Sequence, residues 1–400
     1  MNKLFKAAIV GGGASGLLCA VELLSGDNRL KGEDVVILER NDRVGKKLIA
    51  TGNGQGNLTN VSISAENYSG NPAFISKFIE QVKNVNLTEY LKNFGVITEK
   101  DEIGRIYPIS RQANSVLDIL RAYLIGNNCT VVTGYKAVNI AEQNGVFSIL
   151  SESGEKITAE NVVLAIGGKA AKQFGTDGQS YSLAVNFGHT LTPLYPSLVQ
   201  LKTDKEPIRG LKGIKSNAVV SLCDGDALVK KATGDLLFTD YGVSGNAVFK
   251  ISDKVADLKE PTLKIDFLPS LTDKSLTAII EKRLSDGFIP KNDILNGLIN
   301  KKIGETIVKS AFGNLDGIIK SVKAFKIKVT GTLGFDYAQT TKGGVKTAEI
   351  NPDTYESKLK KGLYITGETL DITGECGGYN LTFAFVSGIF AARAIKNNKY

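Results

Sequence analysis

The sequence predicts an α/β protein whose parallel sheet is interrupted by a β-rich insertion and a small group of helices. A strand, a glycine turn, a helix and a second strand follow one another within residues 7–39. Two later apolar runs, at 161–168 and 362–368, also contain glycines at their ends, as expected of strands in the same sheet. Residues 191–340 instead show short alternating runs, which are typical of antiparallel strands.

The segment at 7–39 carries the most informative motif. The apolar run Ala7–Val10 ends in Gly11-x-Gly13-x-x-Gly16, which leads into a helix-period apolar stripe. A second apolar run then ends in Glu39. This order of elements is the fingerprint of a Rossmann-like βαβ unit that binds a dinucleotide.

Each motif residue has a physical task in such a unit. Gly11 allows the tight turn, Gly13 lets a pyrophosphate approach the backbone, and Gly16 lets the helix pack closely on the strand. The first helical turn offers free N–H groups and a partial positive charge to the phosphates. Glu39 is expected to accept hydrogen bonds from the adenosine ribose. The motif alone does not distinguish FAD from NAD.

The rest of the first domain extends to about residue 190. A loop rich in glycine and asparagine follows the fingerprint at Thr51–Asn60. Apolar spacing predicts amphipathic helices at 72–93 and 111–126. Strands are predicted at Thr130–Val132, Lys136–Ile140, Val146–Leu150 and in the buried run Asn161–Gly168.

The middle of the chain is predicted to form two inserted pieces. Helical spacing over 272–322 predicts a small helical subdomain, and a strand at Ala324–Val329 leads back to the first domain. Strands of the β-rich region are predicted at Ala218–Leu222, Leu236–Thr239, Ala247–Ile251 and Leu263–Phe267. The expected parts are a first domain of 1–190 with 343–400, a β-rich substrate or cap domain of 191–271 with 323–342, and the helical subdomain of 272–322.

A second ligand-facing helix start is predicted near the C-terminus. A strand ends in Gly367-Glu368, a glycine loop follows at Gly374–Leu381, and a helix of small and apolar residues runs to about residue 396. The strand belongs in the first sheet, so the middle region is an insertion.

Composition and charge argue against several classes of protein. The net charge of +8 comes from lysines that are spread along the chain among acids, so no nucleic-acid partner is expected. No apolar run reaches the ~20 residues that span a bilayer, so no membrane association is expected. Four scattered cysteines and one histidine predict no metal site. The cysteine usage, and a strand that begins almost at the first residue, predict a cytoplasmic protein without a signal peptide.

Five ordered motifs extend over nearly the whole chain. Residues 50–60 read ATGNGQGNLTN, and the other four motifs lie at 104–108, 187–193, 237–245 and 343–388. They match the family patterns ATGNG[RK]CNLTN, GR-x-[FY]-P, L-G-H-T-[IL]-x-P, LFTxxGxSGP and GGV…GLYxxGExLDxxGxxGGYNLxxAFxSG. The chain thus resembles the BaiN-like family of bacterial FAD-binding proteins, also called aminoacetone oxidase-like.

The resemblance implies an FAD domain built from both chain ends, an inserted β-barrel-like domain and a small helical piece. It also implies that the flavin ring lies where the FAD domain meets the insert. By the same resemblance, the pyrophosphate loop comprises Gly11, Gly13, Ala14 and Gly16, and Glu39 and Arg40 lie at the adenosine end. The other residues implied to bind FAD are Lys47, Thr51, Gly52, Asn53, Asn57, Leu58, Thr59, Ala137, Gly167, Gly367 and Glu368, with Gly378, Tyr379, Asn380 and Leu381 beside the isoalloxazine.

Four positions depart from the family pattern. Gln55 and Gly56 replace a basic residue and a cysteine, Asp240 replaces a common histidine, and Asn246 replaces a common proline. The cofactor motifs are intact, whereas the loop beside the flavin and the insert have changed. FAD binding is therefore expected. The changed positions leave room for a substrate other than the family's usual one.

The start of the last helix is the expected place of the chemistry. Its N–H groups, from Gly378 to Leu381, are suited to stabilise negative charge on the flavin. Tyr379 and Asn380 are the candidate catalytic residues, with Tyr379 acting either as a proton donor or as a packing residue.

Three other polar residues have a structural interpretation beside a functional one. His189 follows a glycine at a segment end and is expected to be structural. Cys376 is a small residue that fills space, a redox thiol or a covalent anchor, and the first is favoured because no second cysteine is adjacent. Arg105 either meets an anionic substrate or pairs with an acid.

The predicted function is that of an FAD-dependent oxidoreductase acting on a small organic molecule. The preferred version is a reductase that takes hydride from NAD(P)H, which binds transiently because the chain has one dinucleotide fingerprint. One alternative is an aminoacetone-type amine oxidase that releases hydrogen peroxide. Another is a flavin-bound redox sensor without turnover, which the changed Gln55, Gly56 and Asp240 motivate. The sequence does not indicate an oligomeric state.

Overall fold

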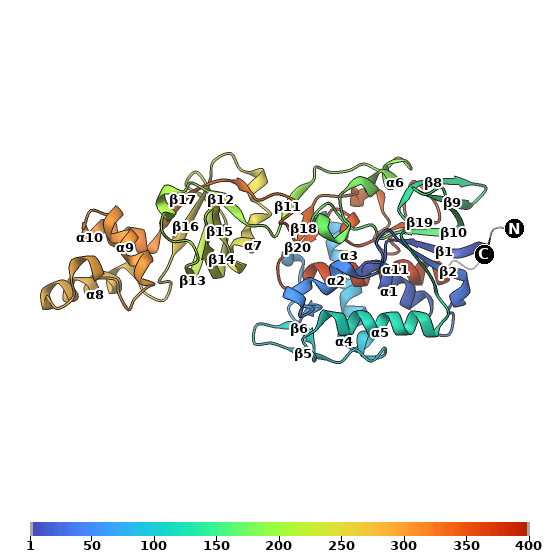
Figure 1. Cartoon of the computed structure of the whole chain (residues 1–400), viewed down its shortest axis with the longest axis horizontal. Helices are drawn as coiled ribbons and strands as arrows, with labels where there is room; N and C mark the ends of the chain where they lie inside the picture. The colour runs from blue at the N-terminus through green and yellow to red at the C-terminus, as the bar shows by residue number, and fades with distance from the viewer. Residues whose placement is uncertain (1–2, 398–400) are drawn as a thin grey trace. The chain divides into compact units, whose positions relative to one another are not determined.

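The computed structural model describes residues 3–397. Internal contacts divide the chain into two units, one of residues up to 194 and from 340 onward, the other of residues 195–339 (Figure 1). Each unit has its own hydrophobic core. Within residues 3–397, no helix combines the length and the apolar character that crossing a membrane requires.

A seven-stranded sheet forms the centre of the first unit. Its order is β7-β2-β1-β10-β9-β8, and β19 pairs with the second half of β10. β7, β2, β1, β10 and β19 are parallel, whereas β9 and β8 are antiparallel additions. The strands are β1 (Leu4–Val10), β2 (Val35–Glu39), β7 (Thr130–Thr133), β8 (Ala137–Gln143), β9 (Val146–Ser151), β10 (Lys156–Leu164) and β19 (Leu363–Ile365). The parallel sheet of the predicted Rossmann-like domain is thereby confirmed.

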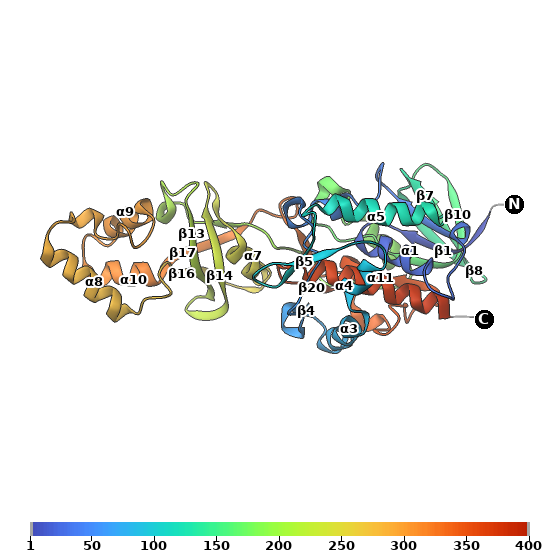
Figure 2. The same ribbon diagram turned by 90° about the horizontal axis from the view of Figure 1, so that it is seen from below.

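Three helices run side by side along this sheet (Figures 1 and 2). They are α5 (Ala113–Gly126), α1 (Ala14–Leu23) and α11 (Tyr379–Asn397). α1 and α11 approach so closely that a Cβ on Gly388 would clash with the Ser15 carbonyl oxygen. The first and last helices of the chain are thus packed together, which brings the two predicted ligand-facing helix starts into one unit.

Smaller elements complete the first unit. The helices are α2 (Lys46–Ile49), α3 (Pro72–Val85), α4 (Leu87–Lys92) and α6 (Ser182–Val185), and the strands are β3 (Thr59–Asn60), β4 (Tyr68–Gly70), β5 (Thr98–Lys100), β6 (Arg105–Pro108), β18 (Thr340–Lys342) and β20 (Ile372–Gly374). The single helix predicted at 72–93 is wrong. Asn86 takes a left-handed conformation with φ +43° and separates α3 from α4.

The second unit contains a closed barrel of six strands in the order β12-β15-β14-β13-β16-β17. All of its pairings are antiparallel, which confirms the β-barrel-like insert. The strands of this unit are β11 (Tyr195–Ser197), β12 (Leu201–Thr203), β13 (Lys215–Asp224), β14 (Ala227–Phe238), β15 (Gly242–Ser244), β16 (Pro261–Asp266) and β17 (Phe325–Thr332). Its helices are α7 (Asn246–Ser252), α8 (Asp273–Asp286), α9 (Lys301–Ser310) and α10 (Leu315–Lys323).

The strand predicted at Ala247–Ile251 is wrong, because this segment is helix α7. Gly245, at φ +106°, ends the extended backbone before it. The buried residues Ala247, Val248 and Ile251 have the spacing of one helix face, and in so short a run that spacing resembles alternation. The helices expected within 272–322 are present as α8, α9 and α10, and they share one unit and one hydrophobic core with the barrel. The bounds of the helical subdomain stay a prediction.

Candidate functional site

The carboxyl ends of four parallel strands meet at one edge of the first unit. β1 pairs with both β2 and β10, and β10 pairs with β19. The segments that follow these strands begin at Gly11, Arg40, Ala165 and Thr366. This edge is the place where open α/β sheets bind their ligands.

The turn after β1 has a backbone that only glycine adopts readily. Gly11 lies at φ +108°, and a Cβ there would clash with the Ala165 carbonyl. A Cβ on Gly16 would clash with the Gly11 carbonyl, so this glycine permits the close packing of α1. Gly13 differs from both, because a Cβ there would meet no atom within 4 Å. The backbone at Gly13 therefore borders open space.

The start of α1 carries unsatisfied polar groups. No side chain caps the helix at Gly13. The Ser15 hydroxyl is buried and has no hydrogen-bond partner among the described residues. Gly367, after β19, lies so near that its Cβ would be 3.0 Å from the Ser15 Cβ. Free N–H groups, an orphaned hydroxyl and open space at Gly13 fit the diphosphate of a dinucleotide.

Glu39, at the end of β2, is buried and holds the adjoining loops. Its Oε2 accepts a hydrogen bond from the Gly12 N–H at 2.8 Å. Its Oε1 accepts from the Asn41 N–H at 2.8 Å and from the Asn41 side-chain amide at 2.7 Å. The Tyr135 N–H donates to the Glu39 carbonyl, which brings Ala137 to the same end of the sheet.

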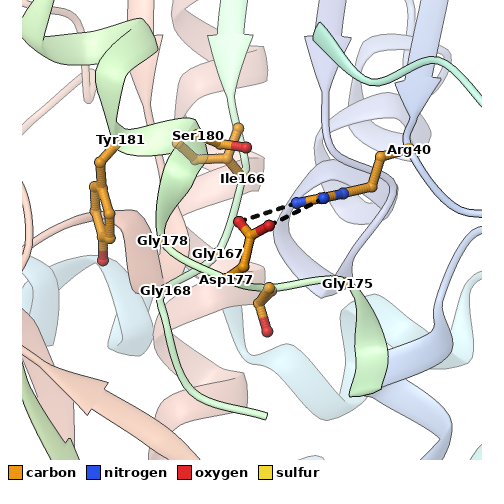
Figure 3. A pocket seen from close by; sticks show the side chains of 10 residues that line it. Arg40, Ile166, Gly167, Gly168, Gly175, Asp177, Gly178, Ser180 and Tyr181 are labelled. Carbon is orange, nitrogen blue, oxygen red and sulfur yellow. Dashed lines mark hydrogen bonds and ion pairs between the residues drawn. The ribbon is translucent and has the colours of Figure 1, made fainter. Parts of the chain in front are cut away.

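Arg40 points into a small pocket beside Glu39. Its guanidinium donates two hydrogen bonds of 3.1 Å to the Asp177 carboxylate, as Figure 3 shows. Burial alone would raise the pKa of Asp177, but hydrogen bonds from Arg40 and the Gln179 N–H lower it below its usual value. The pocket is also lined by Ile166, Gly167, Gly168, Gly175, Thr176, Gly178, Ser180 and Tyr181.

Lys47 and Glu368 form an ion pair of 2.6 Å between α2 and the segment after β19. The other carboxylate oxygen of Glu368 accepts from the Thr341 N–H at 2.9 Å. Gly367 donates its N–H to the Ser387 hydroxyl on α11 at 2.9 Å. The Gly-Glu pair is thereby attached to three separate elements.

The loop at Thr51–Asn60 lies against the start of α11, more than 300 residues further along the chain. The Thr59 and Thr382 hydroxyls are 2.7 Å apart, and the Asn60 amide donates to the Gly377 carbonyl at 3.0 Å. Asn57 accepts from the Gly378 N–H at 3.2 Å when its amide is oriented to satisfy both groups. These contacts join two predicted cofactor segments into one surface.

The remaining loop residues fix its shape. Gly52 and Asn53 are left-handed, at φ +58° and +55°. Thr51 donates its hydroxyl to the Leu48 carbonyl at 2.7 Å, and the buried Leu58 donates its N–H to the Ile106 carbonyl at 2.8 Å. The loop is therefore tied to α2 on one side and to β6 on the other.

The two candidate catalytic residues have different surroundings. The Asn380 side chain accepts from the Gly374 N–H at 2.8 Å and donates to the Gly374 carbonyl at 2.7 Å, so it holds the glycine loop. Tyr379 is buried, and its ring meets that of Tyr68 edge-on at 6.0 Å. Burial, followed by Glu375 and Cys376, raises the pKa of Tyr379. Leu381, two residues after Tyr379 on α11, is partly buried against the core.

Arg105 and His189 are both held by acids. The Arg105 Nε donates to Asp101 at 2.7 Å. His189 is buried, with Nδ1 3.1 Å from Glu349 and Nε2 2.8 Å from the Ser357 hydroxyl. Burial lowers the pKa of His189, although Glu349 opposes this effect. These contacts give both residues a structural role.

Sequence reasoning missed several residues of this edge. Ser15 lay inside the fingerprint but carries no motif letter. Asn41 and Asp177 act through contacts over long sequence separations, which no local pattern reveals. The Thr341 hydroxyl accepts from the Lys169 and Ala170 N–H groups. In the sequence, the one feature that could have pointed to Thr341 is its position shortly before the motif that begins at Gly343.

Known proteins match this chain over nearly its whole length. The chain matches the HI0933-like protein Rossmann domain over residues 5–394. It is 35% identical to the 3-dehydro-bile acid delta(4,6)-reductase of Clostridium scindens, over 98% of this chain and 99% of that protein. It is 27% identical to the ribosomal RNA dihydrouridine synthase of Haemophilus influenzae, over 99% of each.

Solved structures share the fold at low sequence identity. The 3-ketosteroid-delta4-(5alpha)-dehydrogenase of Rhodococcus jostii is 16% identical with a TM-score of 0.53, over 100% of this chain and 98% of that one. The FrdA chain of E. coli quinol fumarate reductase is 15% identical with a TM-score of 0.52, over 99% of this chain and 70% of that one.

The fold and these matches together define a flavoprotein oxidoreductase of the Rossmann type. Within this class, the chain belongs to the HI0933-like family, whose model it matches over nearly its full length. The BaiN-like resemblance inferred from the five motifs is therefore confirmed.

Proposed function

We propose that this protein is an FAD-dependent reductase that uses NAD(P)H to saturate a carbon–carbon double bond conjugated to a carbonyl. The observation that carries the proposal is the row of groups along one edge of the first unit. Glu39 holds the Gly12 N–H before α1, and Gly367, beside the start of α1, donates to Ser387 on α11. Such a site suits a long cofactor with a diphosphate at its middle and a redox ring at one end.

The proposed FAD site follows the geometry of that edge. The first turn of α1 would hold the diphosphate, Glu39 and Arg40 the adenosine end, and Glu368 the ribityl chain. When bound, FAD supplies the ring that carries hydride between donor and substrate. The remaining proposed cofactor residues are those of the Thr51–Asn60 loop, Lys47, Ala137, Gly167 and the start of α11.

The chain's own residues would serve the reaction in three ways. The N–H groups at the start of α11 would stabilise negative charge, because they lie at the positive end of a 19-residue helix. Asn380 would keep this helix start in place through Gly374. Tyr379 would present a protonated phenol near neutral pH, as tyrosines ordinarily do, and burial raises its pKa further.

The double bond is inferred from the relatives. One is named a delta(4,6)-reductase of a 3-dehydro bile acid and another a dihydrouridine synthase. Both names describe saturation of a C=C bond conjugated to a carbonyl. In the overall reaction, hydride from NAD(P)H joins one carbon, a proton joins the other, and NAD(P)⁺ leaves.

A uridine in RNA is a second candidate substrate. Two relatives are named ribosomal RNA dihydrouridine synthase, and both match almost the whole chain. The sequence-based exclusion of a nucleic-acid partner rested on lysines that are spread along the chain. The names of these two relatives are stronger evidence than that distribution. The exclusion is therefore withdrawn, and small molecules and RNA are both retained as candidates.

An anaerobic flavin experiment tests the proposal. NADPH or NADH is mixed with the FAD-loaded protein in a stopped-flow instrument, and flavin absorbance is followed. Bleaching by a nicotinamide, followed by reoxidation on addition of a steroid enone or of a uridine-containing RNA, supports a reductase. Bleaching by aminoacetone with peroxide on admission of air would support the oxidase instead. Protein that stays colourless after incubation with FAD would refute every flavin-based function.

A further inference from the structure

A strap of residues 167–181 joins β10 to α6 and lines the pocket in Figure 3. It contains two short 3-10 turns, Lys172–Phe174 and Gln179–Tyr181, and otherwise no regular structure. Segments of this kind do not hold their shape by backbone ladders. The contacts that the strap makes with the rest of the unit therefore determine where it lies.

Asn41 connects the strap to the carboxylate of Glu39, at the proposed adenosine end of the cofactor site. Its side-chain nitrogen donates to Glu39 Oε1 at 2.7 Å and to the Phe174 carbonyl at 3.1 Å. The strap passes so closely that a Cβ on Gly175 would lie 2.7 Å from both side-chain ends of Asn41. One amide group therefore links the carboxylate predicted to bind ribose with the middle of the strap.

Arg40 provides the second attachment. It binds Asp177 through two parallel hydrogen bonds, and the two side chains are 26% and 16% exposed. The same carboxylate accepts from the Gln179 N–H at 3.0 Å, so it also shapes the next turn of the strap. A partly buried bidentate pair is stronger and more directional than a surface ion pair.

The other end of the strap is attached on the ribityl side. The Thr341 hydroxyl accepts from the Lys169 and Ala170 N–H groups at 2.8 and 2.9 Å. The Thr341 N–H in turn donates to Glu368. The strap thus links the two acidic groups that border the proposed cofactor site.

We propose that the strap is a clasp over the adenosine half of the cofactor, and that Arg40, Asn41 and Asp177 are the positioning residues that keep it closed. The inference rests on the proposed FAD site and adds to it residues that determine cofactor retention. A closed clasp slows the release of FAD. It has no such effect on FMN, which lacks the adenosine half.

Asp177→Asn tests the clasp, because it keeps the size of the side chain and removes the bidentate acceptor. We expect FAD to dissociate on the order of tenfold faster, measured as the gain of free-flavin fluorescence after dilution of the loaded protein into buffer. FMN affinity should stay within about twofold of that of the unaltered protein. The matched control is Glu160→Gln, which removes the ion pair with Lys6 in the middle of β10.

Tryptic cleavage supplies a readout that needs no flavin. Lys172 lies exposed in the strap, so its cleavage rate reports opening of the clasp. We expect Asp177→Asn and Asn41→Ala to speed cleavage at Lys172, and saturating FAD to slow it in the unaltered protein. Arg40→Lys should give an intermediate rate, because a lysine keeps the charge but loses the paired donors.

The possible results separate the clasp from the proposed function. If the unaltered protein binds FAD and Asp177→Asn releases FAD and is cut at Lys172 at unchanged rates, the clasp is refuted and the FAD site stands. Equal losses of FAD and FMN affinity would also refute the clasp, because they indicate general damage to the site. Failure of the unaltered protein to bind any flavin would overturn the proposed function and the clasp with it.

Discussion

Tyr379 and Asn380 are neighbours at the start of α11, but the structure gives their side chains different surroundings. The Asn380 amide is occupied on both sides by the backbone of Gly374, which suits a residue that holds a loop. The Tyr379 carbonyl, in contrast, accepts from the buried Tyr68 hydroxyl, and the Tyr379 ring packs edge-on against the Tyr68 ring. Of the two, Tyr379 is the candidate that has a proton to give.

Replacing Tyr379 by phenylalanine tests that role. The phenol of a tyrosine is protonated throughout the neutral range, and burial raises the pKa of Tyr379 further. We expect Tyr379→Phe to slow reduction of the substrate by roughly 100-fold and to leave flavin reduction by NADPH within about twofold. Stopped-flow measurement of the two half-reactions separates these effects. The control is Tyr123→Phe, which removes a hydroxyl bound to the Leu24 carbonyl. Unchanged rates in both half-reactions would assign Tyr379 to packing.

His189 predicts how stability depends on pH. Its pKa is lowered by burial, so the folded chain keeps it neutral while the unfolded chain takes up a proton near pH 6.5. Stability is then fully present above about pH 7 and falls as the pH drops, by up to roughly 1 kcal/mol per pH unit. Glu349, whose pKa is also lowered despite its burial, acts only around pH 4 and below.

Thermal unfolding between pH 7.5 and 5.5 tests this expectation. The chain has a single histidine, so no second imidazole contributes in that range. We expect the melting temperature to decline over this interval, and His189→Gln to start lower and to decline less. A melting temperature that rises on acidification would contradict the buried neutral imidazole.

At the scale of elements, the sequence was most informative where a motif lies on one short segment. The βαβ fingerprint predicted β1, α1 and β2, because each glycine there answers a local steric demand. Tertiary contacts decided the rest. The left-handed backbone of Asn86 separates two helices although the apolar pattern continues across it. Helix α7 has seven residues, too few for a helical period of apolar residues to be distinguished from strand alternation. Asp177 binds Arg40 across 137 residues, which no local pattern could predict.

The glycine turn after β1 separates folding from cofactor binding. A methyl group at Gly13 would meet open space, so Gly13→Ala should fold with nearly unchanged stability. It should nevertheless weaken FAD binding at least tenfold by taking up the space proposed for the diphosphate. Gly16→Ala should instead destabilise the fold by about 2 kcal/mol, because its Cβ would clash with the Gly11 carbonyl.

Denaturant unfolding and a fluorescence titration with FAD, applied to both variants, measure the two effects separately. Gly32→Ala is the control, because its Cβ would clash with the Asn127 carbonyl away from the glycine turn. It tests the effect of a steric clash that leaves the proposed diphosphate site unchanged. A Gly13→Ala protein that binds FAD as tightly as the unaltered chain would contradict the placement of the diphosphate.

At the scale of the whole molecule, charge and exposed aromatic rings gather in the second unit. Residues 195–339 contain 22 Lys and Arg against 17 Asp and Glu, an excess of five of the chain's net +8. Phe312 is 94% exposed and Phe288 is 73% exposed. Exposed aromatic rings with nearby lysines are the features on which nucleic-acid bases stack.

The two rings lie at the same end of the helical subdomain. β16 and β17 pair at Ile265 and Phe325, so the start of α8 and the end of α10 both adjoin the barrel. Lys323 holds them together there by donating to the Leu268 and Leu271 carbonyls at 2.7 Å. The end of α8, followed by Phe288, and the start of α10, preceded by Phe312, are therefore both at the far end.

RNA binding by this end decides between the two candidate substrates. If uridine in RNA is the substrate, the double substitution Phe288→Ala and Phe312→Ala should weaken binding of a single-stranded, uridine-containing RNA about tenfold or more, because each lost stacking contact costs ~1–3 kcal/mol. Fluorescence anisotropy at several salt concentrations measures the affinity and its electrostatic share. Tyr337→Ala removes another exposed ring of the same unit and is the matched control. Flavin reduction by NADPH should be unaffected in both variants, because neither change lies in the first unit. If the unaltered protein turns over a steroid enone but binds RNA neither tightly nor in a salt-dependent way, the substrate is a small molecule and the exposed rings serve another purpose.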